Sequence, residues 1–358
     1  MKLIKAKNIS DYKKEIAKEF KITEGKKEVF VIIDDNLKEY FHFFSEYNLL
    51  KIKALESNKT LAAIEKIYTW LLKKGAERNS VLIGVGGGVV TDITGYATAT
   101  YMRGIRCVLI PTTLLSQCDA SIGGKNGVNF SRYKNIIGTI REPQLVIVCT
   151  EFLKTLPQRV FKEGVAEMLK TFLIANAQAY KKGVTFFSKY FSIPSESLSP
   201  QNNKRTENEL ESLIKLAQKI KLEIVGQDLY EKGRRKILNF GHTYAHAIES
   251  IFPNKVLHGE AVSIGIAMAI NESVQRGYCS KKDGEKVIAD LRKLSLPTSL
   301  AELEIESTRD ESQSIAKLIA KAIKKDKKRV GEKINFIFFK KIGEVVCESV
   351  RICELKNL

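Results

Sequence analysis

The stretch SVLIGVGGGVVTD, at residues 80–92, decides the fold because it joins an apolar strand pattern to a helical pattern through a run of glycines. Glycine allows positive φ and lets a phosphate approach the backbone closely. A helix that begins near Thr91 or Asp92 would direct its free amides and the positive end of its dipole toward such a phosphate. The third glycine of the usual dinucleotide fingerprint is replaced by Val89, and no GK[ST] of a P-loop follows. Taken alone, the turn is equally consistent with nucleotide binding and with a tight structural turn.

Apolar strands alternate with helical patterns on both sides of this turn. Strands are predicted at 28–34, 51–55, 106–111 and 144–149, and helices at 37–47 and 60–74. Because parallel sheets are covered on both faces, the alternation predicts an α/β domain with a Rossmann-like parallel sheet. From about residue 150 the patterns become helical, at 159–180, 209–227, 240–252 and 259–278, with one late strand at 334–339. We therefore expect an α/β domain at residues 1–156 and a mostly α-helical domain at residues 157–358.

The composition excludes several classes of protein. Of 358 residues, 44% are hydrophobic and 28% are charged, which excludes a wholly disordered chain. No uncharged apolar run reaches the length of about 18 residues that a membrane span needs, and the charged N-terminus lacks the apolar core of a signal peptide. We expect a cytoplasmic protein. The six cysteines form no CxxC pair, so we interpret them as reduced core residues.

The formal net charge of +18, from 59 basic and 41 acidic residues, has two interpretations. Most basic residues are scattered through amphipathic segments, which favours solvated, lysine-rich faces, and an anionic ligand is the alternative. A nucleic-acid surface is disfavoured because aromatic residues do not interleave with the basic ones.

Three of the four histidines lie within residues 242–258. His242 and His246 are four residues apart, so both project from one face of a helix, and His258 begins the next helical pattern. Imidazoles suit zinc or a similar divalent ion, and Glu167, in the apolar segment GVAEMLK, could complete the site. One such histidine alone is more often a core residue, but the clustering favours a metal or catalytic site. The HxxxH spacing lacks the internal glutamate of HExxH proteases, and one helix histidine could instead act as an acid or base.

Polar residues follow the strands that flank the glycine turn. Asp34 and Asn36 follow the first strand, and Thr112 and Thr113 follow the strand at 106–111. The carboxyl ends of parallel strands collect at one edge, where ligands bind, so these residues could hold ribose or phosphate. Each of them taken singly is more often an N-cap or turn residue.

Cations accompany these segments. They are Lys125, Lys134, Lys170, Lys221, Arg235 and Lys327. A pocket lined by such groups would suit a phosphorylated carboxylate. For any one of them, a surface position is the ordinary alternative, because lysine is abundant in this chain.

Seven blocks of sequence, in order, resemble the 3-dehydroquinate synthase family. They are GGGVVTDITGYATATYMRG, IPTTLLSQCDASIGGKNGVN, KNIIGTIREP, FLKTLP, GVAEMLK, KILNFGHTYAHAIE and LHGEAVSIG, and the resemblance runs from about Asp34 to Lys328. It implies an NAD-binding domain at 1–156, a helical metal- and substrate-binding domain at 157–358, a divalent metal such as Zn²⁺ or Co²⁺, and a homodimer. The implied enzyme is a carbon–oxygen lyase of the shikimate pathway that converts 3-deoxy-D-arabino-heptulosonate 7-phosphate to 3-dehydroquinate and phosphate. The implied steps are transient oxidation by NAD, phosphate elimination, reduction, ring opening and intramolecular aldol closure.

The same resemblance implies roles for individual residues. The metal ligands are Glu167, His242 and His258, and His246 and Glu231 contact substrate or transfer protons. NAD is held by Asp34, Asn36, Glu56, Lys59, Gly87, Gly88, Val89, Asp92, Thr112, Thr113, Lys134, Phe152, Leu153, Lys154 and Thr155. Substrate meets Asp119, Lys125, Lys170, Lys221, Arg235, Asn239 and Lys327, and Arg103 reaches the phosphate of a neighbouring subunit's substrate.

Two segments depart from the family pattern. Residues 55–58, LESN, lack the proline and glycine often found in that cofactor loop, which bears on Glu56 and Lys59. Residues 230–233, YEKG, differ from the usual acidic-arginine run, which bears on Glu231. Either Lys327 or Lys328 could face the substrate.

Three alternative functions make different predictions. A related sugar-phosphate cyclase would share the NAD turn and metal ligands but differ at the residues that face the substrate carboxylate. A metal-dependent polyol dehydrogenase would accumulate NADH, whereas a cyclase releases phosphate without net NADH. A basic nucleic-acid-binding protein would show salt-sensitive affinity for DNA or RNA that survives chelation.

Overall fold

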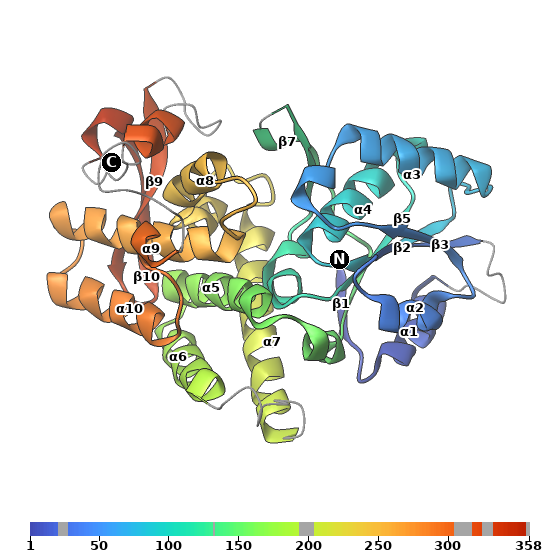
Figure 1. Cartoon of the computed structure of the whole chain (residues 1–358), viewed down its shortest axis with the longest axis horizontal. Coiled ribbons are helices and arrows are strands. Elements are labelled where there is room, and N and C mark those ends of the chain that lie inside the picture. The colour runs from blue at the N-terminus through green and yellow to red at the C-terminus, as the bar shows by residue number, and fades with distance from the viewer. Residues whose placement is uncertain (21–27, 132, 193–203, 304–316, 324–331, 356–358) are drawn as a thin grey trace. The chain divides into compact units, whose positions relative to one another are not determined.

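The computed structural model describes residues 1–20, 28–131, 133–192, 204–303, 317–323 and 332–355. The chain forms two compact units, Met1–Pro157 and Gln158–Leu358. In Figure 1 the elements of the first unit run from blue to green, and those of the second run from green to red.

The first unit is built on a six-stranded parallel sheet with the order β1-β8-β5-β4-β2-β3. Its strands are β1 (Lys2–Lys5), β2 (Val29–Asp34), β3 (Asn48–Ile52), β4 (Val81–Gly86), β5 (Arg106–Pro111) and β8 (Leu145–Val148). The predicted Rossmann-like parallel sheet is thus confirmed. The strand expected at 51–55 lies three residues earlier, because β3 pairs with β2 from Asn48 to Ile52 and the pairing stops where β2 ends at Asp34.

Helices cover both faces of this sheet. In Figure 1, α1 (Tyr12–Phe20) and α2 (Phe41–Phe44) lie on one face, and α3 (Leu61–Lys73) and α4 (Gly88–Thr100) lie on the other. The helix predicted at 37–47 is instead a 3₁₀ turn at Lys38–Tyr40 followed by the single turn of α2.

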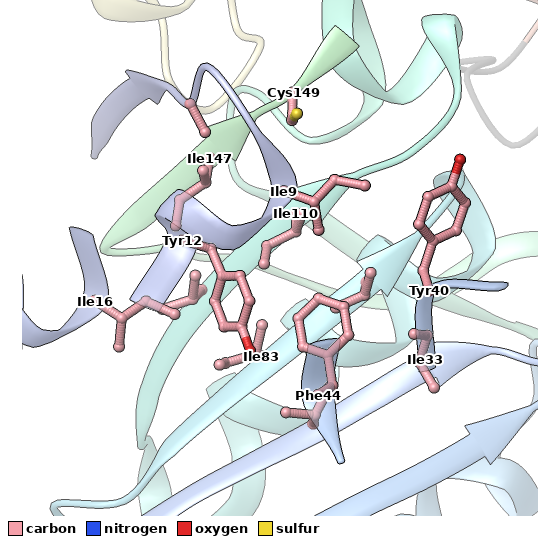
Figure 2. Close-up of a cluster of buried hydrophobic side chains, with 14 of the residues drawn as sticks. Ile9, Tyr12, Ile16, Ile33, Tyr40, Phe44, Ile83, Ile110, Ile147 and Cys149 are labelled. Atoms are coloured by element: carbon pink, nitrogen blue, oxygen red, sulfur yellow. The ribbon is translucent and has the colours of Figure 1, made fainter. Parts of the chain in front are cut away.

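Alternating side chains of β2 enter two separate cores. Val31 and Ile33 pack with Tyr12 and Phe44 on the side of α1 and α2, and Figure 2 shows Ile33, Tyr12 and Phe44 in this cluster. Ile32 packs on the opposite side, in the core that α3 and α4 share. Burial of both faces is the reason that these strands are continuous apolar runs in the sequence.

Helix α4 begins earlier than its sequence predicts. Glycine has a low helix propensity, which favours a start near Thr91, but Gly87 is the N-cap and Gly88 is the first helical residue. The packing of α4 against β4 and β5 outweighs the local preference. An antiparallel hairpin of β6 (Lys125–Phe130) and β7 (Tyr133–Ile140) was not predicted, because KNGVNF is polar and contains glycine.

The second unit is mostly helical, as predicted. Its helices are α5 (Gln158–Ala175), α6 (Ala177–Ser192), α7 (Lys204–Gln227), α8 (His242–Ile251), α9 (His258–Gln275) and α10 (Lys281–Lys293). The single helical pattern at 159–180 is interrupted between α5 and α6, where Asn176 Oδ1 accepts the Ala179 N–H at 2.9 Å and caps α6. The late strand pattern forms β9 (Lys333–Lys341), which pairs antiparallel with β10 (Glu344–Arg351).

Short turns and a helical segment at 317–323 complete the described structure. The 3₁₀ turns are Ile9–Asp11, Lys38–Tyr40, Glu56–Asn58, Tyr101–Arg103, Thr150–Thr155, Arg234–Asn239, Leu300–Glu302 and Ile352–Glu354, and Ser116–Ala120 is a π turn. Among the helices that the structure describes, none combines the length and apolarity needed to cross a membrane. Cys107, Cys118 and Cys149 are core residues as expected, but Cys353 is exposed, so the core interpretation does not extend to all six cysteines.

Candidate functional site

Three side chains with metal-ligand chemistry converge in the second unit. Glu167 comes from the middle of α5, His242 is the first residue of α8, and His258 is the first residue of α9. Oε1 of Glu167 lies 3.3 Å from Nε2 of His242 and 3.1 Å from Nε2 of His258. One ligand atom from each residue lies within 4.8 Å of the other two. Tetrahedral zinc with bonds of about 2.1 Å separates its ligand atoms by about 3.4 Å, so the three side chains fit a divalent metal ion.

Glycines allow the three helices to approach closely enough for this convergence. Gly241, directly before His242, has a left-handed φ of 78°. A Cβ on Gly265 of α9 would lie 2.2 Å from the carbonyl oxygen of Gly241. A Cβ on Gly259 would lie 2.3 Å from the Cα of Glu163 on α5. Helix α9 therefore contacts α8 and α5 at distances that only glycine permits, and this packing fixes the backbone of the candidate ligands.

Buried charges surround the cluster. Lys170 Nζ lies 2.6 Å from Oε2 of Glu167, and both side chains are almost fully buried. Burial raises the pKa of the Glu167 carboxyl, but Lys170 and the two histidines outweigh burial and hold it well below its usual range. Glu167 is therefore an ionised carboxylate, the form that binds a metal.

The pKa values of the two histidines are shifted in opposite directions. Burial lowers the pKa of His242 and favours the neutral imidazole that coordinates metals. Burial also acts against a charged His258, but Glu249 and Glu167 outweigh it and raise the pKa of His258 well above its usual range. Carboxylates that favour a proton on this ring also favour a metal cation in its place.

His246 lies one turn after His242 on α8, and the centroids of the two rings are 5.4 Å apart. The ligand group found among the described residues includes His242 and His258 and leaves His246 outside it. His246 is thus close to the cluster without being one of its ligand candidates.

An aspartate organises the loop that precedes α8. The carboxylate of Asp228 accepts the backbone N–H groups of Lys232, Gly233 and Arg235 at 2.9, 2.7 and 3.0 Å. Burial raises the pKa of Asp228, but these hydrogen bonds outweigh it and lower the pKa overall. Within this loop Glu231 holds a left-handed φ of 57°, which is rare for a residue other than glycine. Asp228 therefore fixes the backbone that directly follows Glu231, a predicted site residue.

Three of the predicted cations are buried rather than exposed. Lys170 is 2%, Lys221 6% and Arg235 2% exposed, so the ordinary surface position is wrong for these three. Helix α5, which carries Lys170, packs against α7, which carries Lys221, and against the Arg234–Asn239 turn. In the same loop the side-chain amide of Asn239 donates to Oε1 of Glu231.

The other predicted substrate residues are more accessible. Lys125 and Arg103 are exposed, and Asp119 is half-buried in the π turn. Lys134, a predicted NAD contact, is also exposed. Lys327 and Lys328 lie outside the described residues.

In the first unit, the strand order marks a ligand-binding edge. β3 lies beyond β2, whereas β5 lies beyond β4, so the order reverses between the neighbours β2 and β4. Open parallel sheets bind ligands at the carboxyl ends of the strands at such a reversal. Asp34 ends β2, Gly86 ends β4, and Thr112 and Thr113 directly follow β5.

The glycines of the turn divide into two groups. A Cβ on Gly84 would lie 2.5 Å from Oγ1 of Thr94, and one on Gly86 would lie 2.5 Å from Cγ2 of Val90. A Cβ on Gly88 would meet no atom closer than 3.7 Å, so packing does not require glycine there. Because α4 begins at Gly88, its first amides, which lack helical partners, lie at this turn. Gly84 and Gly86 are therefore required by the packing of a tight turn. At Gly88, the free amides at the start of α4 suit a phosphate.

Several predicted cofactor residues also have turn roles. Oδ1 of Asp34 accepts the backbone N–H and the side-chain amide of Asn36, both at 3.1 Å. Burial raises the pKa of Asp34 in spite of these hydrogen bonds. Oγ1 of Thr113 accepts the Ser116 N–H at 3.1 Å. Thr112 is buried, and Gly87 is the N-cap of α4.

A buried ion pair lies beside the glycine turn. Lys59 is 3% exposed and pairs with Asp92 of α4. Glu56 accepts the side-chain amide of Asn129 at 2.9 Å. Although residues 55–58 depart from the family pattern, their loop therefore carries fixed side chains next to the turn.

In the Thr150–Thr155 turn, the backbone is better placed to contact NAD than the side chains are. Phe152 and Leu153 are buried in the core. Val89, a predicted NAD contact on α4, is partly buried against the core that α3 and α4 share. Lys154 is exposed, and the Thr155 hydroxyl lies 3.3 Å from that of Tyr40.

Sequence reasoning missed two residues of these sites. Glu249 Oε1 lies 3.4 Å from Nδ1 of His258 and its side chain is almost fully buried. The signal that singled out Glu167, an acid among apolar residues, is also present in AHAIES and would have found it. Asp228 gives no such signal, because an aspartate in a polar loop is an ordinary turn residue.

Comparison with known proteins supplies the family. The chain matches the model described as 3-dehydroquinate synthase N-terminal at residues 49–163 and the one described as 3-dehydroquinate synthase C-terminal at 164–329. It is 39% identical over 310 residues to the 3-dehydroquinate synthase of Ruminiclostridium cellulolyticum, which covers 87% of this chain and 80% of that protein. It is 42% identical over 296 residues to that of Campylobacter concisus, which covers 82% of this chain and 77% of that protein.

A solved structure supports the fold. The 2-epi-5-epi-valiolone synthase of Streptomyces hygroscopicus, solved with NAD⁺ and Zn²⁺ bound, matches 99% of this chain and 94% of its own with a TM-score of 0.79. At 24% identity this likeness shows the common fold alone. The family models cover both units, and the relatives share about two residues in five over most of their length. This chain therefore belongs to the 3-dehydroquinate synthase family.

Proposed function

We propose that this chain converts 3-deoxy-D-arabino-heptulosonate 7-phosphate to 3-dehydroquinate and phosphate, as a carbon–oxygen lyase of the shikimate pathway. The observation that carries the proposal is the convergence of Glu167, His242 and His258 within 4.8 Å, in a chain that matches both halves of the family. Relatives about 40% identical to this chain bear the name of this activity.

Two cofactors fit the residues present. Glu167, His242 and His258 would hold Zn²⁺ or Co²⁺, because a carboxylate and two imidazoles are ligands of these ions and their donor atoms all lie within 4.8 Å of one another. NAD would lie at the carboxyl edge of the first unit, with its pyrophosphate at the start of α4. Further NAD contacts would come from Asp34, Asn36, Glu56, Lys59, Gly87, Gly88, Val89, Asp92, Thr112, Thr113, Lys134 and the turn 152–155. When bound, NAD supplies reversible hydride transfer and the metal supplies polarisation of substrate oxygens.

The buried cations would bind the anionic groups of the substrate. Lys170, Lys221 and Arg235 are held within one packed group of elements, so they present positive charge with little conformational freedom. A guanidinium matches the two oxygens of a carboxylate or phosphate, whereas an ammonium acts as a point charge. Asp119, Lys125, Asn239 and Lys327 would complete the substrate contacts.

His246 and Glu231 would be the proton-transfer groups. His246 lies next to the metal candidates, and an imidazole can hold or release a proton near neutral pH. Glu231 is held by Asn239 and by the left-handed backbone that Asp228 supports. A carboxylate fixed in this way can accept a proton at Oε2 while Oε1 receives the Asn239 amide.

We further propose that the chain forms a homodimer in the cytoplasm, as its resemblance to the family implies. The β6–β7 hairpin exposes Phe130, Tyr133, Ile136 and Ile140, each at least 39% accessible, which suits a surface for a second copy. Arg103, exposed beside Gly104, would then reach the substrate phosphate of the neighbouring subunit. Sedimentation of the purified chain measures the oligomeric state directly.

A phosphate-release assay tests the proposed reaction. The purified chain, loaded with Zn²⁺ and given less NAD than substrate, should release one phosphate per 3-dehydroquinate formed. NADH should not accumulate. Chelation should stop the reaction, and added Zn²⁺ should restore it. Accumulation of NADH without phosphate release would instead identify a polyol dehydrogenase, and phosphate release only from a different sugar phosphate would identify a related cyclase.

A further inference from the structure

The two candidate imidazole ligands are held by chemically different groups. Nδ1 of His242 lies 3.2 Å from the backbone carbonyl oxygen of Phe240. Nδ1 of His258 lies 3.4 Å from Oε1 of Glu249. In both rings the opposite nitrogen, Nε2, faces Oε1 of Glu167. One ring is therefore oriented by a neutral acceptor and the other by a carboxylate.

Helix α8 places Glu249 where it can reach a residue of another helix. Glu249 follows His242 by seven residues, so both side chains project from the same face of α8 two turns apart. Close packing at Gly241 and Gly265 brings α9 against this face. Helix α8 thus contributes one candidate ligand and also contacts the candidate ligand of α9.

We propose that Glu249 is a positioning residue of the metal centre, whose carboxylate accepts the Nδ1–H of His258 and so holds its Nε2 toward the ion. This inference rests on the metal centre of the proposed function. The proton on Nδ1 leaves Nε2 with a free lone pair, and a charged acceptor makes that nitrogen a stronger donor. His258 is accordingly the more tightly held imidazole ligand, because His242 has only a carbonyl behind it.

Glu163, a neighbouring acid, makes a different kind of contact. Glu163 also lies close to His258, but its Oε2 accepts the backbone N–H of Gly259 at 3.4 Å. That contact stabilises the start of α9 and does not orient the imidazole ring. Among the contacts of His258 that the structure describes, Glu249 is the carboxylate placed at Nδ1.

Three variants of the full chain separate a positioning role from a purely structural one. Glu249→Ala removes the acceptor, and Glu249→Gln keeps an oxygen that can accept the Nδ1–H but removes its charge. Glu272→Gln is the matched control, because Glu272 is a fully buried acid of α9 that pairs with Arg276 at 2.6 Å. It lies fourteen residues from His258, a rise of about 21 Å along the helix.

The measurements are the Zn²⁺ dissociation constant, by competition with a chelator, and the visible spectrum of the Co²⁺-loaded protein. We expect Glu249→Ala to weaken Zn²⁺ binding about 10- to 100-fold and to alter the Co²⁺ spectrum. Glu249→Gln should weaken binding less, because the hydrogen bond persists. Glu272→Gln should lower the melting temperature and leave Zn²⁺ affinity unchanged.

Two results would overturn the inference while leaving the proposed function intact. One is parental Zn²⁺ affinity in both Glu249 variants. The other is equal weakening in Glu272→Gln, which would assign the effect to general destabilisation. If the parent itself binds no Zn²⁺, both the inference and the metal centre fail. If Glu249→Ala does not fold, Glu249→Gln and its Co²⁺ spectrum still decide between parental and altered coordination.

Discussion

At the scale of single residues, one buried carboxylate is surrounded by three groups that can carry a positive charge. Glu167 is 1% exposed and contacts Lys170, His242 and His258. An unpaired buried carboxylate would be strongly unfavourable, so each of these contacts compensates for its desolvation. Lys170 supplies one positive charge, and the two imidazoles place their Nε2 atoms 3.3 and 3.1 Å from Oε1 of Glu167.

The first prediction concerns His258. His258→Ala should reduce bound Zn²⁺ to background and lower activity about 1000-fold or more, since a metal contributes several kcal/mol to such a reaction. The fold should persist, because His258 occupies the first position of α9 and not its packed interior. Metal analysis, the phosphate assay and circular dichroism check the three parts. His42→Ala, which removes an exposed histidine of the first unit, is the control. An active, metal-free His258→Ala protein would refute the ligand assignment.

The second prediction concerns Asp228 and pH. The three backbone N–H groups outweigh burial and lower the pKa of Asp228 in the folded chain. Its contribution to stability is therefore present above the ordinary Asp value of about 3.9 and is lost as the pH falls through the lowered folded value. Asp228→Asn cannot ionise, so its urea midpoint should fall less than that of the parent below about pH 4. Identical acid profiles in the two proteins would contradict this role.

At the residue scale, the sequence singled out residues in unusual local patterns. It could not single out residues whose local sequence is ordinary. Glu167 and the histidine cluster could be found because an acid in an apolar segment and three closely spaced histidines are unusual. The burial of Lys221 and Arg235 could not, because nothing distinguishes them locally from the other basic residues among 59. Their burial depends on the packing of α5, α7 and the Arg234–Asn239 turn, which is a tertiary property.

At the scale of elements, the crossing of α8 and α9 is the critical contact of the metal centre. Gly265→Ala would place a methyl group 2.2 Å from the carbonyl oxygen of Gly241, where backbone must move. We expect a loss of about 3 kcal/mol in unfolding free energy, together with weaker Zn²⁺ binding. Gly226→Ala is the matched control, because a Cβ there meets nothing within 4 Å on α7. It should gain about 0.5 to 1 kcal/mol from higher helix propensity. Urea denaturation of both variants tests the pair, and equal stability would show that the crossing tolerates side chains.

A second element contact fixes the end of α9 to the C-terminal hairpin. Arg276 pairs with the fully buried Glu272 at 2.6 Å, and its guanidinium lies 5.4 Å from the ring centroid of Phe338 on β9. Arg276→Met should cost about 3 to 5 kcal/mol, because it leaves a buried carboxylate without its cation. Adding Glu272→Gln to that variant should recover part of the loss. Chemical denaturation of the single and double variants measures the recovery, and its absence would show that the packing of Arg276, and not its charge, stabilises this region.

The elements themselves were predicted to different degrees for physical reasons. Strands buried on both faces are visible as apolar runs, which is why β5 and β8 were found within a residue of their bounds. The start of α4 was predicted too late, because local propensity penalises glycine whereas the packed strand–turn–helix unit accepts it at Gly88. Strand β6, KNGVNF, is mostly polar and contains a glycine, and β7, YKNIIGTI, is largely exposed and has its isoleucines in succession, so neither shows the regular apolar alternation on which strand prediction depends.

At the scale of the whole molecule, the two candidate cofactor sites belong to different units. The glycine turn lies within Met1–Pro157, and Glu167, His242 and His258 lie within Gln158–Leu358. Among the described residues four cations are buried, namely Lys59, Lys170, Lys221 and Arg235. They explain little of the net charge of +18, since the chain has 59 basic residues. The rest of the excess accords with the lysine-rich solvated faces expected from the sequence.

This division predicts that each cofactor stabilises its own unit. A ligand at 100 times its dissociation constant adds about 2.7 kcal/mol to the stability of the state that binds it. Zn²⁺ should therefore slow amide hydrogen exchange chiefly in α5, α8 and α9, which carry its candidate ligands. NAD should slow exchange at residues 84–92 and at the turn after β5, where the candidate nucleotide edge lies. Hydrogen-exchange mass spectrometry of the chain with each cofactor alone resolves the two patterns.

His258→Ala should lose the Zn²⁺ effect and keep the NAD effect, because only the second unit is altered. Protection by Zn²⁺ that is as strong in the first unit as in α8 and α9, or that survives in His258→Ala, would place the metal elsewhere.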